Sequence, residues 1–337
     1  MRKLRLSFAA ELSERTRPLI DGTVQPEGIE LVPTVADPSE IFWRQLKFSE
    51  FEVSAMSFSS YLIAKAQGAK SVAIPVFPAR RFMHTQLFIH ADSGIKEPGD
   101  LLGRRIGVGE YQQTAALWTR RILEHDFGVS QYRVHWFMER TEELSHGGAT
   151  GFTPPEGISF ERIPPEKSLA SMLVNHELDA APIHRALQKG ANMIDRSTHN
   201  RGLGGDWSKI KPLFPDVIAE GERFFKKHGY VPASHTYIIR GDVYERHPWI
   251  AFNLYKAFAQ AKDAARDSLA ENIPSGLIFG AQYLATTREI LGRDPFPYGI
   301  AANGKMIETM IEASYEQGLT PRKLKVDELF ASNTLGF

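Results

Sequence analysis

The sequence contains no cysteine, and this absence excludes several kinds of chemistry. Without thiols the chain can form neither disulfides nor thiolate metal sites, and it has no cysteine nucleophile. An excess of charge is also missing, because 40 Lys and Arg residues balance 40 Asp and Glu residues. A chain of zero net charge has no general field that attracts nucleic acid or an anionic membrane, so we expect neither as a partner. Selectivity for an anion must therefore come from a local cluster of basic residues.

Long apolar runs are absent as well. No window approaches the roughly 20 apolar residues that a membrane-spanning helix needs. Residues 1–10 carry only a brief apolar run, without the longer apolar core and small-residue cleavage site of a secretory signal. We therefore expect a globular protein of the cytoplasm. With 337 residues the chain can bury a large core and form two domains.

Apolar strand-like runs alternate along the chain with helical periods, a pattern that favours a largely parallel sheet covered by helices. Strands are expected at 3–8, 29–33, 53–58, 72–77, 105–108, 133–137, 158–163, 178–183 and 235–240. Helices are expected at 39–48, 60–67, 111–127, 166–175 and 248–269. The step from the strand at 105–108 through Gly109 into a helix is notable, because a helix start attracts a carboxylate or phosphate.

Several familiar catalytic and cofactor motifs are missing. Gly107 and Gly109 are followed by Gln112 where the dinucleotide fingerprint needs a third glycine. There is no phosphate-binding Gly-Lys-Ser/Thr loop and no Gly-x-Ser-x-Gly elbow of a serine hydrolase. None of the histidines is spaced like a usual zinc-ligand pair. The sequence thus predicts no cofactor. A divalent metal held by His84, His184 and His235 stays open as an alternative that no spacing supports.

Seven short motifs follow one another over nearly the whole chain. They are 25–29 (QPEGI), 56–61 (MSFSSY), 74–80 (IPVFPAR), 107–112 (GVGEYQ), 240–249 (RGDVYERHPW), 297–299 (PYG) and 316–319 (EQGL). In this order they resemble the 4,5-dihydroxyphthalate decarboxylase family. The resemblance weakens in the polar loops 140–157 and 190–206. At 181–186 (APIHRA) the chain departs from the Ala-Pro-Arg typical of the family.

The resemblance implies a two-lobed α/β fold similar to the type II periplasmic binding proteins. Each lobe would be a mixed sheet flanked by helices, with the ligand cleft between the lobes. Lobe one would be discontinuous, comprising 1–90 and 240–337, and lobe two would be the inserted segment 91–239. The activity implied is that of a carboxy-lyase, which protonates the ring of 4,5-dihydroxyphthalate or a related aromatic carboxylate and releases carbon dioxide.

Arginine and histidine side chains follow the ends of expected strands, where open α/β sheets bind ligands. Arg80 and His84 come just after the strand at 72–77, and His235 opens the strand at 235–240. Because arginine binds a carboxylate through two parallel hydrogen bonds, Arg80 would anchor the carboxylate that remains on the ring. His84 or His235 would donate the proton, since histidine titrates near neutral pH. The structural alternative is a solvated basic turn with satisfied histidines.

The remaining substrate-binding candidates are polar side chains at other strand or helix ends: Ser57, Ser59, Tyr111, Thr114, His184 and Arg185. One serine of the group at 57–60 is expected to cap the following helix. Tyr111 is as compatible with packing as with binding, and Thr114 with helix capping.

A non-catalytic solute-binding or sensor protein for an aromatic or small carboxylate is the alternative function, because the same two lobes would serve it. A synthase of the thiamine pyrimidine is a weaker alternative, since the synthase of that family consumes a cysteine that this chain lacks. The expected partner is a small aromatic carboxylate, and self-association into a homo-oligomer is left open.

Overall fold

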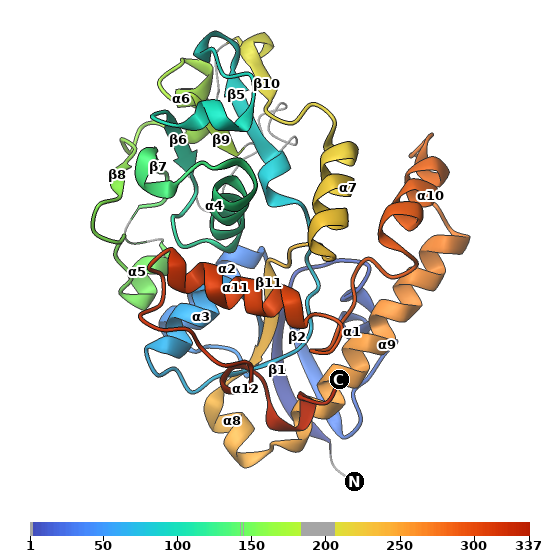
Figure 1. Cartoon of the computed structure of the whole chain (residues 1–337). Coiled ribbons are helices and arrows are strands. Elements are labelled where there is room, and N and C mark those ends of the chain that lie inside the picture. The colour runs from blue at the N-terminus through green and yellow to red at the C-terminus, as the bar shows by residue number, and fades with distance from the viewer. Residues whose placement is uncertain (1–2, 142, 144, 183–205) are drawn as a thin grey trace. The chain divides into compact units, whose positions relative to one another are not determined.

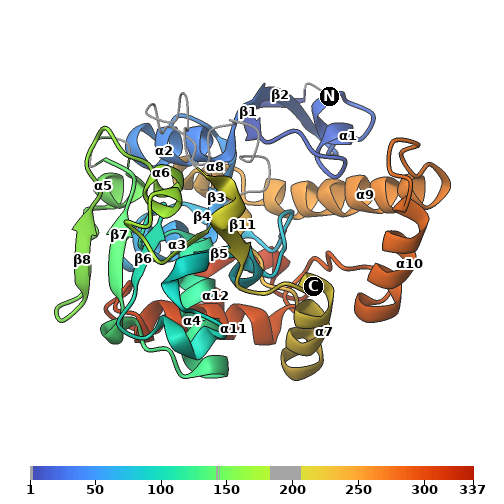
Figure 2. The same ribbon diagram turned by 90° about the horizontal axis from the view of Figure 1, so that it is seen from above.

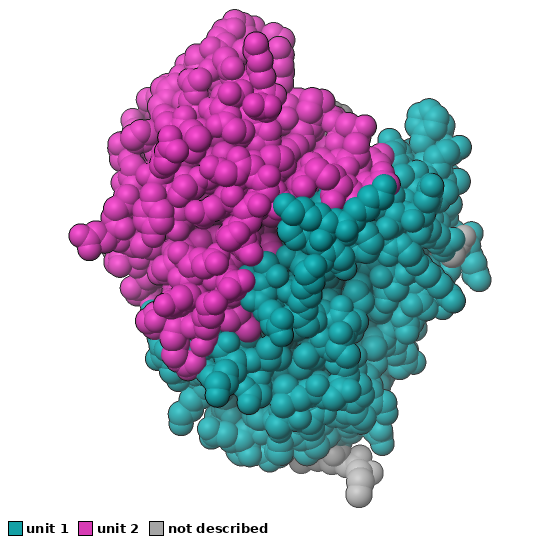
Figure 3. Space-filling model, in the orientation of Figure 1, with its two compact units in different colours: residues 1–81, 224–309, 324–337 teal, residues 82–223, 310–323 magenta. Residues whose placement is uncertain are grey.

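The computed structural model describes residues 3–141, 143, 145–182 and 206–337. The chain divides into two compact units, which Figure 3 colours separately. Unit 1 comprises Met1–Arg81, Phe224–Thr309 and Leu324–Phe337; unit 2 comprises Phe82–Arg223 and Met310–Lys323. These ranges differ from the expected lobes in three places: 82–90 and 310–323 belong to unit 2, and 224–239 belongs to unit 1.

Unit 1 is built on a five-stranded mixed sheet of order β2-β1-β3-β11-β4. Its strands are β1 (Leu4–Ala10), β2 (Ile29–Val35), β3 (Val53–Ser57), β4 (Val72–Ile74) and β11 (His235–Ile239). Its helices are α1 (Arg17–Ile20), α2 (Pro38–Phe48), α3 (Phe58–Ala66), α8 (Gly241–Arg246), α9 (Trp249–Glu271), α10 (Gly280–Leu291) and α12 (Val326–Leu329) (Figure 1). Strand β1 runs parallel to β2 and β3, whereas β11 is antiparallel to β3 and β4.

Unit 2 contains a six-stranded mixed sheet of order β10-β5-β9-β6-β7-β8. Its strands are β5 (Leu87–His90), β6 (Arg105–Val108), β7 (His135–Met138), β8 (Ser159–Arg162), β9 (Ala180–Pro182) and β10 (Ile210–Pro212). Its helices are α4 (Thr114–Phe127), α5 (His146–Thr150) and α6 (Leu169–Val174). The helices α7 (Val217–His228) and α11 (Gly304–Glu316) contribute residues to both units. The expected fold class, mixed α/β with a sheet in each part, is confirmed.

Local sequence signals explain where several elements begin and end. Helix α2 starts at Pro38 after Asp37, whose side chain accepts a hydrogen bond from the backbone N–H of Ser39. Strand β4 ends at Ile74, shorter than expected, because Pro75 has no N–H to continue the ladder. Helix α4 begins at Thr114, three residues later than expected. No helix in the described part of the chain combines the length and hydropathy of a membrane-spanning segment.

Aromatic rings fix α9 on the sheet of unit 1. The ring of Tyr237 on β11 lies 4.3 Å from that of Phe258 on α9 and 5.8 Å from that of Phe8 on β1. All three side chains are fully buried. In unit 2 the sheet packs equally closely on α6, since a Cβ at Gly107 would lie 2.5 Å from Leu169 Cδ2. Rigid packing of this kind holds the strand ends, and the polar side chains on them, in fixed positions.

Candidate active site

Three polar residues of unit 1 lie at one edge of its sheet. Glu11 directly follows the last residue of β1, Ser57 ends the parallel strand β3, and His235 begins β11. The antiparallel register pairs His235 with Ser57, while Phe8 of β1 lies opposite Val53 of β3. This is the carboxyl edge of the parallel strands, where open α/β sheets bind their ligands.

His235 and Glu11 form a partly open ion pair. Nδ1 of His235 lies 3.7 Å from Oε1 of Glu11, within the range of an ion pair but beyond that of a hydrogen bond. The two side chains retain 17% and 29% of their exposure. The ring of Phe42 meets the imidazole edge-on at 4.9 Å and fixes its plane. The histidine is therefore held in orientation without being sealed from a ligand.

The charge of Glu11 is maintained by its surroundings. Burial alone raises the pKa of this carboxyl, but the interactions with His235 and the charges of Arg81 and Arg15 outweigh burial. The pKa of Glu11 consequently lies below its ordinary value of 4.5. At neutral pH the group is a carboxylate, available to balance an imidazolium ion. Sequence reasoning missed Glu11, although its position directly after a strand is the signal that could have found it.

Ser57 and Ser59 are both buried at the junction of β3 and α3. Ser57 is the N-cap of α3, and its Oγ accepts a hydrogen bond from the backbone N–H of Ser60 at 3.4 Å. The expectation that one serine of this group caps the helix is thus confirmed for Ser57. A role of either serine in substrate binding stays a prediction.

Arg80 and Arg81, adjacent in sequence, have opposite environments. The guanidinium of Arg80 is buried in unit 1, where it donates to the carbonyls of Val231 and Pro297 and to the side chain of Asn303. Burial lowers the pKa of Arg80 to about 10. The side chain of Arg81 is exposed, and its charge acts on Glu11. The sequence assigned substrate anchoring to Arg80, but the structure directs the donors of Arg80 to protein acceptors.

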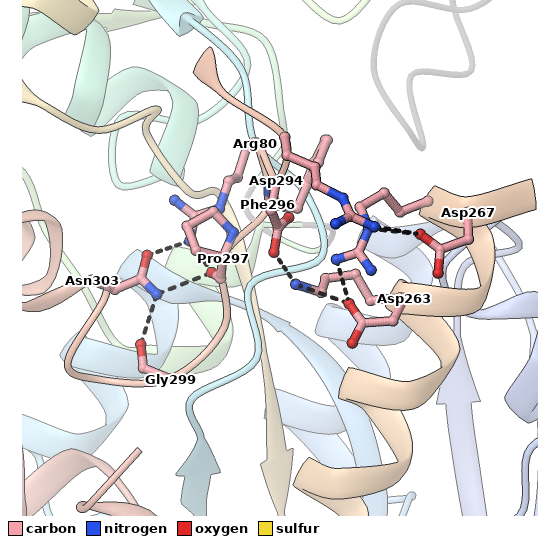
Figure 4. A network of polar contacts seen from close by, with 11 residues as sticks. Arg80, Asp263, Asp267, Asp294, Phe296, Pro297, Gly299 and Asn303 are labelled. Atoms are coloured by element: carbon pink, nitrogen blue, oxygen red, sulfur yellow. Dashed lines mark hydrogen bonds and ion pairs between the residues drawn. The ribbon is translucent and has the colours of Figure 1, made fainter. Parts of the chain in front are cut away.

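Figure 4 shows the contacts between Arg80 and the segment 294–303. Asn303 accepts from Arg80 and donates to the carbonyls of Pro297 and Gly299, the latter at 2.7 Å. Further along the same segment, Asp294 pairs with Lys262 of α9. The network ties the segment 294–303 to α9 and to Arg80, which lies in the stretch after β4, so Arg80 stabilises the fold in this arrangement.

His84 lies in unit 2, on the 3₁₀ turn Met83–Gln86, and its side chain is completely buried. Its Nε2 lies 2.6 Å from Oε1 of Glu220, which also accepts two hydrogen bonds from Arg223. Burial raises the pKa of Glu220, but the hydrogen bonds from Arg223 and His84 outweigh this and keep the pKa below its ordinary value. His84 therefore belongs to a buried ionic network and is less accessible to a ligand than His235.

Tyr111 is likewise an internal residue of unit 2. Its hydroxyl donates to Oε1 of Gln131 at 2.6 Å, and the guanidinium carbon of Arg120 lies 3.7 Å from its ring centroid. Burial raises the pKa of Tyr111. Thr114 is the first residue of α4 and is buried, while Gln113 occupies the N-cap position. Tyr111 is thus packed in the interior of unit 2, and a direct contact between Tyr111 and the substrate stays a prediction.

A second cluster of unit 2 was missed at the sequence level. Glu110 and Arg140 follow the neighbouring parallel strands β6 and β7, and their side chains form a fully buried ion pair. The carboxylate of Glu110 also accepts from the side chains of Gln112 and Ser145 and from the backbone N–H of His146. Burial raises the pKa of Glu110, yet the charges of His146 and Arg140 bring it below its ordinary value. The cluster lies at the start of the segment 140–157, which the sequence had presented as a polar loop.

His184 and Arg185 lie outside the described residues, as does most of the predicted loop 190–206. The proposed set of His84, His184 and His235 as metal ligands therefore has no described geometry. Within the ranges that the structure describes, no group of three histidine or acidic side chains is placed to hold a metal ion.

Comparison with curated proteins gives two relatives. The chain is 33% identical over 333 residues to a 4,5-dihydroxyphthalate decarboxylase from Comamonas testosteroni, covering 98% of this chain and 97% of the relative. It is 40% identical over 181 residues to a protein of the same name from Pseudomonas putida, covering 53% of this chain and 70% of that relative. No family model matches the chain.

Solved structures resemble the whole chain at low sequence identity. A periplasmic aliphatic sulphonate binding protein from Escherichia coli matches with a TM-score of 0.52 and 14% identity, covering 100% of both chains. The desulfurization enzyme DSZB matches with a TM-score of 0.52 and 15% identity, covering 99% of this chain and 98% of that one. These neighbours have the two-domain fold of periplasmic binding proteins. Because they include a binding protein and an enzyme, the fold alone does not separate the two functions.

Proposed function

Since the chain belongs to the 4,5-dihydroxyphthalate decarboxylase family, we propose that it removes carbon dioxide from 4,5-dihydroxyphthalate or a related aromatic carboxylate. The observation that carries this proposal is the similarity to the Comamonas relative over nearly the full length of both chains. The site would lie in a cleft between the lobes, as the sequence predicts. A cytoplasmic location belongs to the same proposal.

The proposed reaction proceeds by protonation of the ring. A proton adds to the carbon that carries the departing carboxylate, and a ring hydroxyl stabilises the positive charge that develops. The bond to the carboxylate then breaks, its electron pair restores the aromatic ring, and carbon dioxide leaves. This chemistry needs a general acid that functions near neutral pH, and histidine is the usual residue for it.

We assign the proton donor to His235. Its ring is oriented by Phe42, retains exposure, and lies beside a carboxylate that can balance the imidazolium ion. Glu11 would balance the positive charge of the His235 imidazolium ion before the proton is donated. Glu11 would not itself take up a proton, as in other carboxylate–histidine pairs. His84 is the second candidate, and its complete burial against Glu220 makes it the weaker one.

The carboxylate that remains on the product requires a cation. We propose Arg81 for this role in place of Arg80, because Arg81 is exposed and its charge already acts on Glu11. Arginine suits the role since its planar guanidinium can bind both carboxylate oxygens. The remaining predicted contacts to the ring substituents are Ser57, Ser59, Tyr111, Thr114, His184 and Arg185.

The proposal is tested by incubating the purified protein with 4,5-dihydroxyphthalate and separating the products by chromatography. We expect one dihydroxybenzoate and one carbon dioxide per substrate consumed. A parallel sample treated with a chelator tests whether a divalent metal contributes, and thermal unfolding with and without substrate measures binding. Stabilisation without turnover would favour the solute-binding alternative. If the protein shows no stabilisation and no turnover with 4,5-dihydroxyphthalate, this substrate is rejected.

A further inference from the structure

Arg15 lies in the loop between β1 and α1, at the same carboxyl edge of the unit 1 sheet as Glu11. The loop is fixed from within by the buried side chain of Thr16. The hydroxyl of Thr16 accepts from the backbone N–H of Ser13 at 2.9 Å and donates to the carbonyl of Glu11 at 2.6 Å. Helix α1, which follows the loop, packs beside α9 (Figure 2). The loop therefore holds the side chains of Glu11 and Arg15 on a rigid base.

The guanidinium of Arg15 has a fixed plane. Its central carbon lies 3.9 Å from the centroid of the Phe296 ring, and its Nε donates to the carbonyl of Pro78 at 3.0 Å. Pro78 belongs to the motif at 74–80, and Phe296 directly precedes the motif at 297–299. Two segments that are far apart in the sequence thus meet at this arginine and set its orientation.

The outer end of the Arg15 guanidinium is accessible to a carboxylate. The side chain keeps 18% of its exposure, and its Nη1 pairs with Glu14, whose side chain is 58% exposed. Because an exposed ion pair contributes little free energy, a ligand carboxylate can replace Glu14 at small cost. Nη2 has no hydrogen-bond partner among the residues that the structure describes. Two adjacent donors are therefore available to one ligand.

Three arginines of this part of unit 1 differ in what they offer to a ligand. Arg80 directs its donors to protein acceptors, and Arg81 is exposed. Arg15 combines a fixed plane with an accessible end, so binding a ligand costs it little conformational entropy. The charges of Arg15 and Arg81 both help to lower the pKa of Glu11, the partner of His235. Both cations thus act on the pair to which we assign the chemistry.

We propose that Arg15 binds the carboxylate that stays on the aromatic ring, through two parallel hydrogen bonds from Nη1 and Nη2, with Arg81 as the second cation on the same group. This inference rests on the proposed function, because it adds a substrate-binding residue to that reaction. Contact with both oxygens fixes the plane of the carboxylate and hence the angle at which the ring meets His235. It also makes the site selective for a ring acid over a neutral ring of the same size.

Calorimetric titration with two probes tests the proposal. The probes are 3,4-dihydroxybenzoate, which carries one carboxylate, and its methyl ester, which lacks that charge. We expect Arg15→Met to raise the dissociation constant of the acid by about 10- to 100-fold and that of the ester by less than about twofold, because hydrogen bonds to a charged group are lost only for the acid. The matched control is Arg17→Met, an exposed arginine two residues away, which should bind both probes as the wild type does.

Arg15→Lys separates charge from geometry, and it serves as the test if Arg15→Met does not fold. Lysine keeps the positive charge but lacks the planar pair of donors, so the loss of affinity for the acid should be smaller than in Arg15→Met and larger than in Arg17→Met. In steady-state kinetics both Arg15 variants should raise KM for 4,5-dihydroxyphthalate more than they lower kcat, since the contact is present before and during the reaction.

Unchanged affinity for the acid in Arg15→Met and Arg15→Lys would overturn the inference. So would an equal loss for acid and ester, which would assign Arg15 to the fold alone. In both cases the wild type still binds the acid and turns over substrate, so the proposed function stands. A wild-type chain that binds neither probe and shows no turnover rejects the proposed function, and this inference with it.

Discussion

The carboxyl edges of the two sheets carry the same residue types with opposite consequences. In unit 2, Glu110 is fully buried and accepts hydrogen bonds from several protein donors, including Arg140. In unit 1, Glu11 and His235 keep part of their exposure at an ion-pair distance of 3.7 Å. A carboxylate already saturated by buried donors can release none of them to a ligand without a large cost. Residue type therefore marks both edges as candidates, and the exposure of Glu11 and His235 is why we propose the edge of unit 1 for the chemistry.

The first prediction removes His235, the proposed proton donor at the carboxyl edge of the unit 1 sheet. We expect His235→Asn to reduce turnover of 4,5-dihydroxyphthalate by about 10²- to 10⁴-fold, the usual contribution of a general acid. Thermal stability should change little, because the side chain is partly exposed and its ion pair with Glu11 is a long one, at 3.7 Å. Steady-state kinetics and thermal unfolding measure the two effects. His247→Asn, in the same unit, is the control, and full activity of His235→Asn would reject the assignment.

The second prediction removes the buried ion pair of Glu110 and Arg140 at the carboxyl edge of the unit 2 sheet. Glu110→Gln leaves the charge of Arg140 in a buried site without its carboxylate, which should cost about 3–5 kcal/mol of unfolding free energy. Urea denaturation followed by circular dichroism measures the loss. The double variant Glu110→Gln/Arg140→Met should recover part of the stability, since it removes the buried charge as well. A cost below 1 kcal/mol for the single variant would show that the ion pair does not stabilise unit 2.

The third prediction compares two neighbouring arginines. Arg80→Met removes buried charged donors to two carbonyls and to Asn303, so we expect a loss of about 2–4 kcal/mol in unfolding free energy. Arg81→Met should leave stability within about 0.5 kcal/mol, because the side chain is exposed. In exchange it should raise KM on the order of tenfold through loss of a carboxylate contact. The opposite pattern, with KM sensitive to Arg80 alone, would restore the role that the sequence gave to Arg80.

The sequence predicted the fold better than the site, and particular residues explain why. Strand and helix patterns depend on local periodicity, so β6 was located to the residue and α2 to within one residue. The motif at 74–80 indicated a site near Arg80, but whether a guanidinium faces a ligand or Pro297 depends on a segment more than 200 residues away. Glu11 and Glu110 escaped notice because each is a single acid after a strand, and only the sheet pairing brings His235 or Arg140 beside it.

The smallest predicted effect concerns the contribution of Glu11 to the free energy of unfolding at acid pH. Because the pKa of Glu11 is below its ordinary value in the folded protein, its contribution to stability is complete above pH 4.5 and is lost as the pH falls through the lower folded value. Between pH 5 and pH 3 the wild type should therefore lose stability more steeply than Glu11→Gln, by at most about 1.4 kcal/mol per pH unit.

Urea denaturation across this pH range measures the difference, with Glu14→Gln as a control at an exposed neighbour whose side chain is 58% accessible. At pH 7, Glu11→Gln should retain the acid His235 but lose the charge that balances the imidazolium ion, so turnover should fall by less than in His235→Asn. Equal acid slopes for Glu11→Gln and the wild type would mean that the pair at the open edge adds nothing to stability. The pair of Glu11 and His235 would then contribute to the proposed reaction alone, whereas the buried pair of Glu110 and Arg140 contributes to stability.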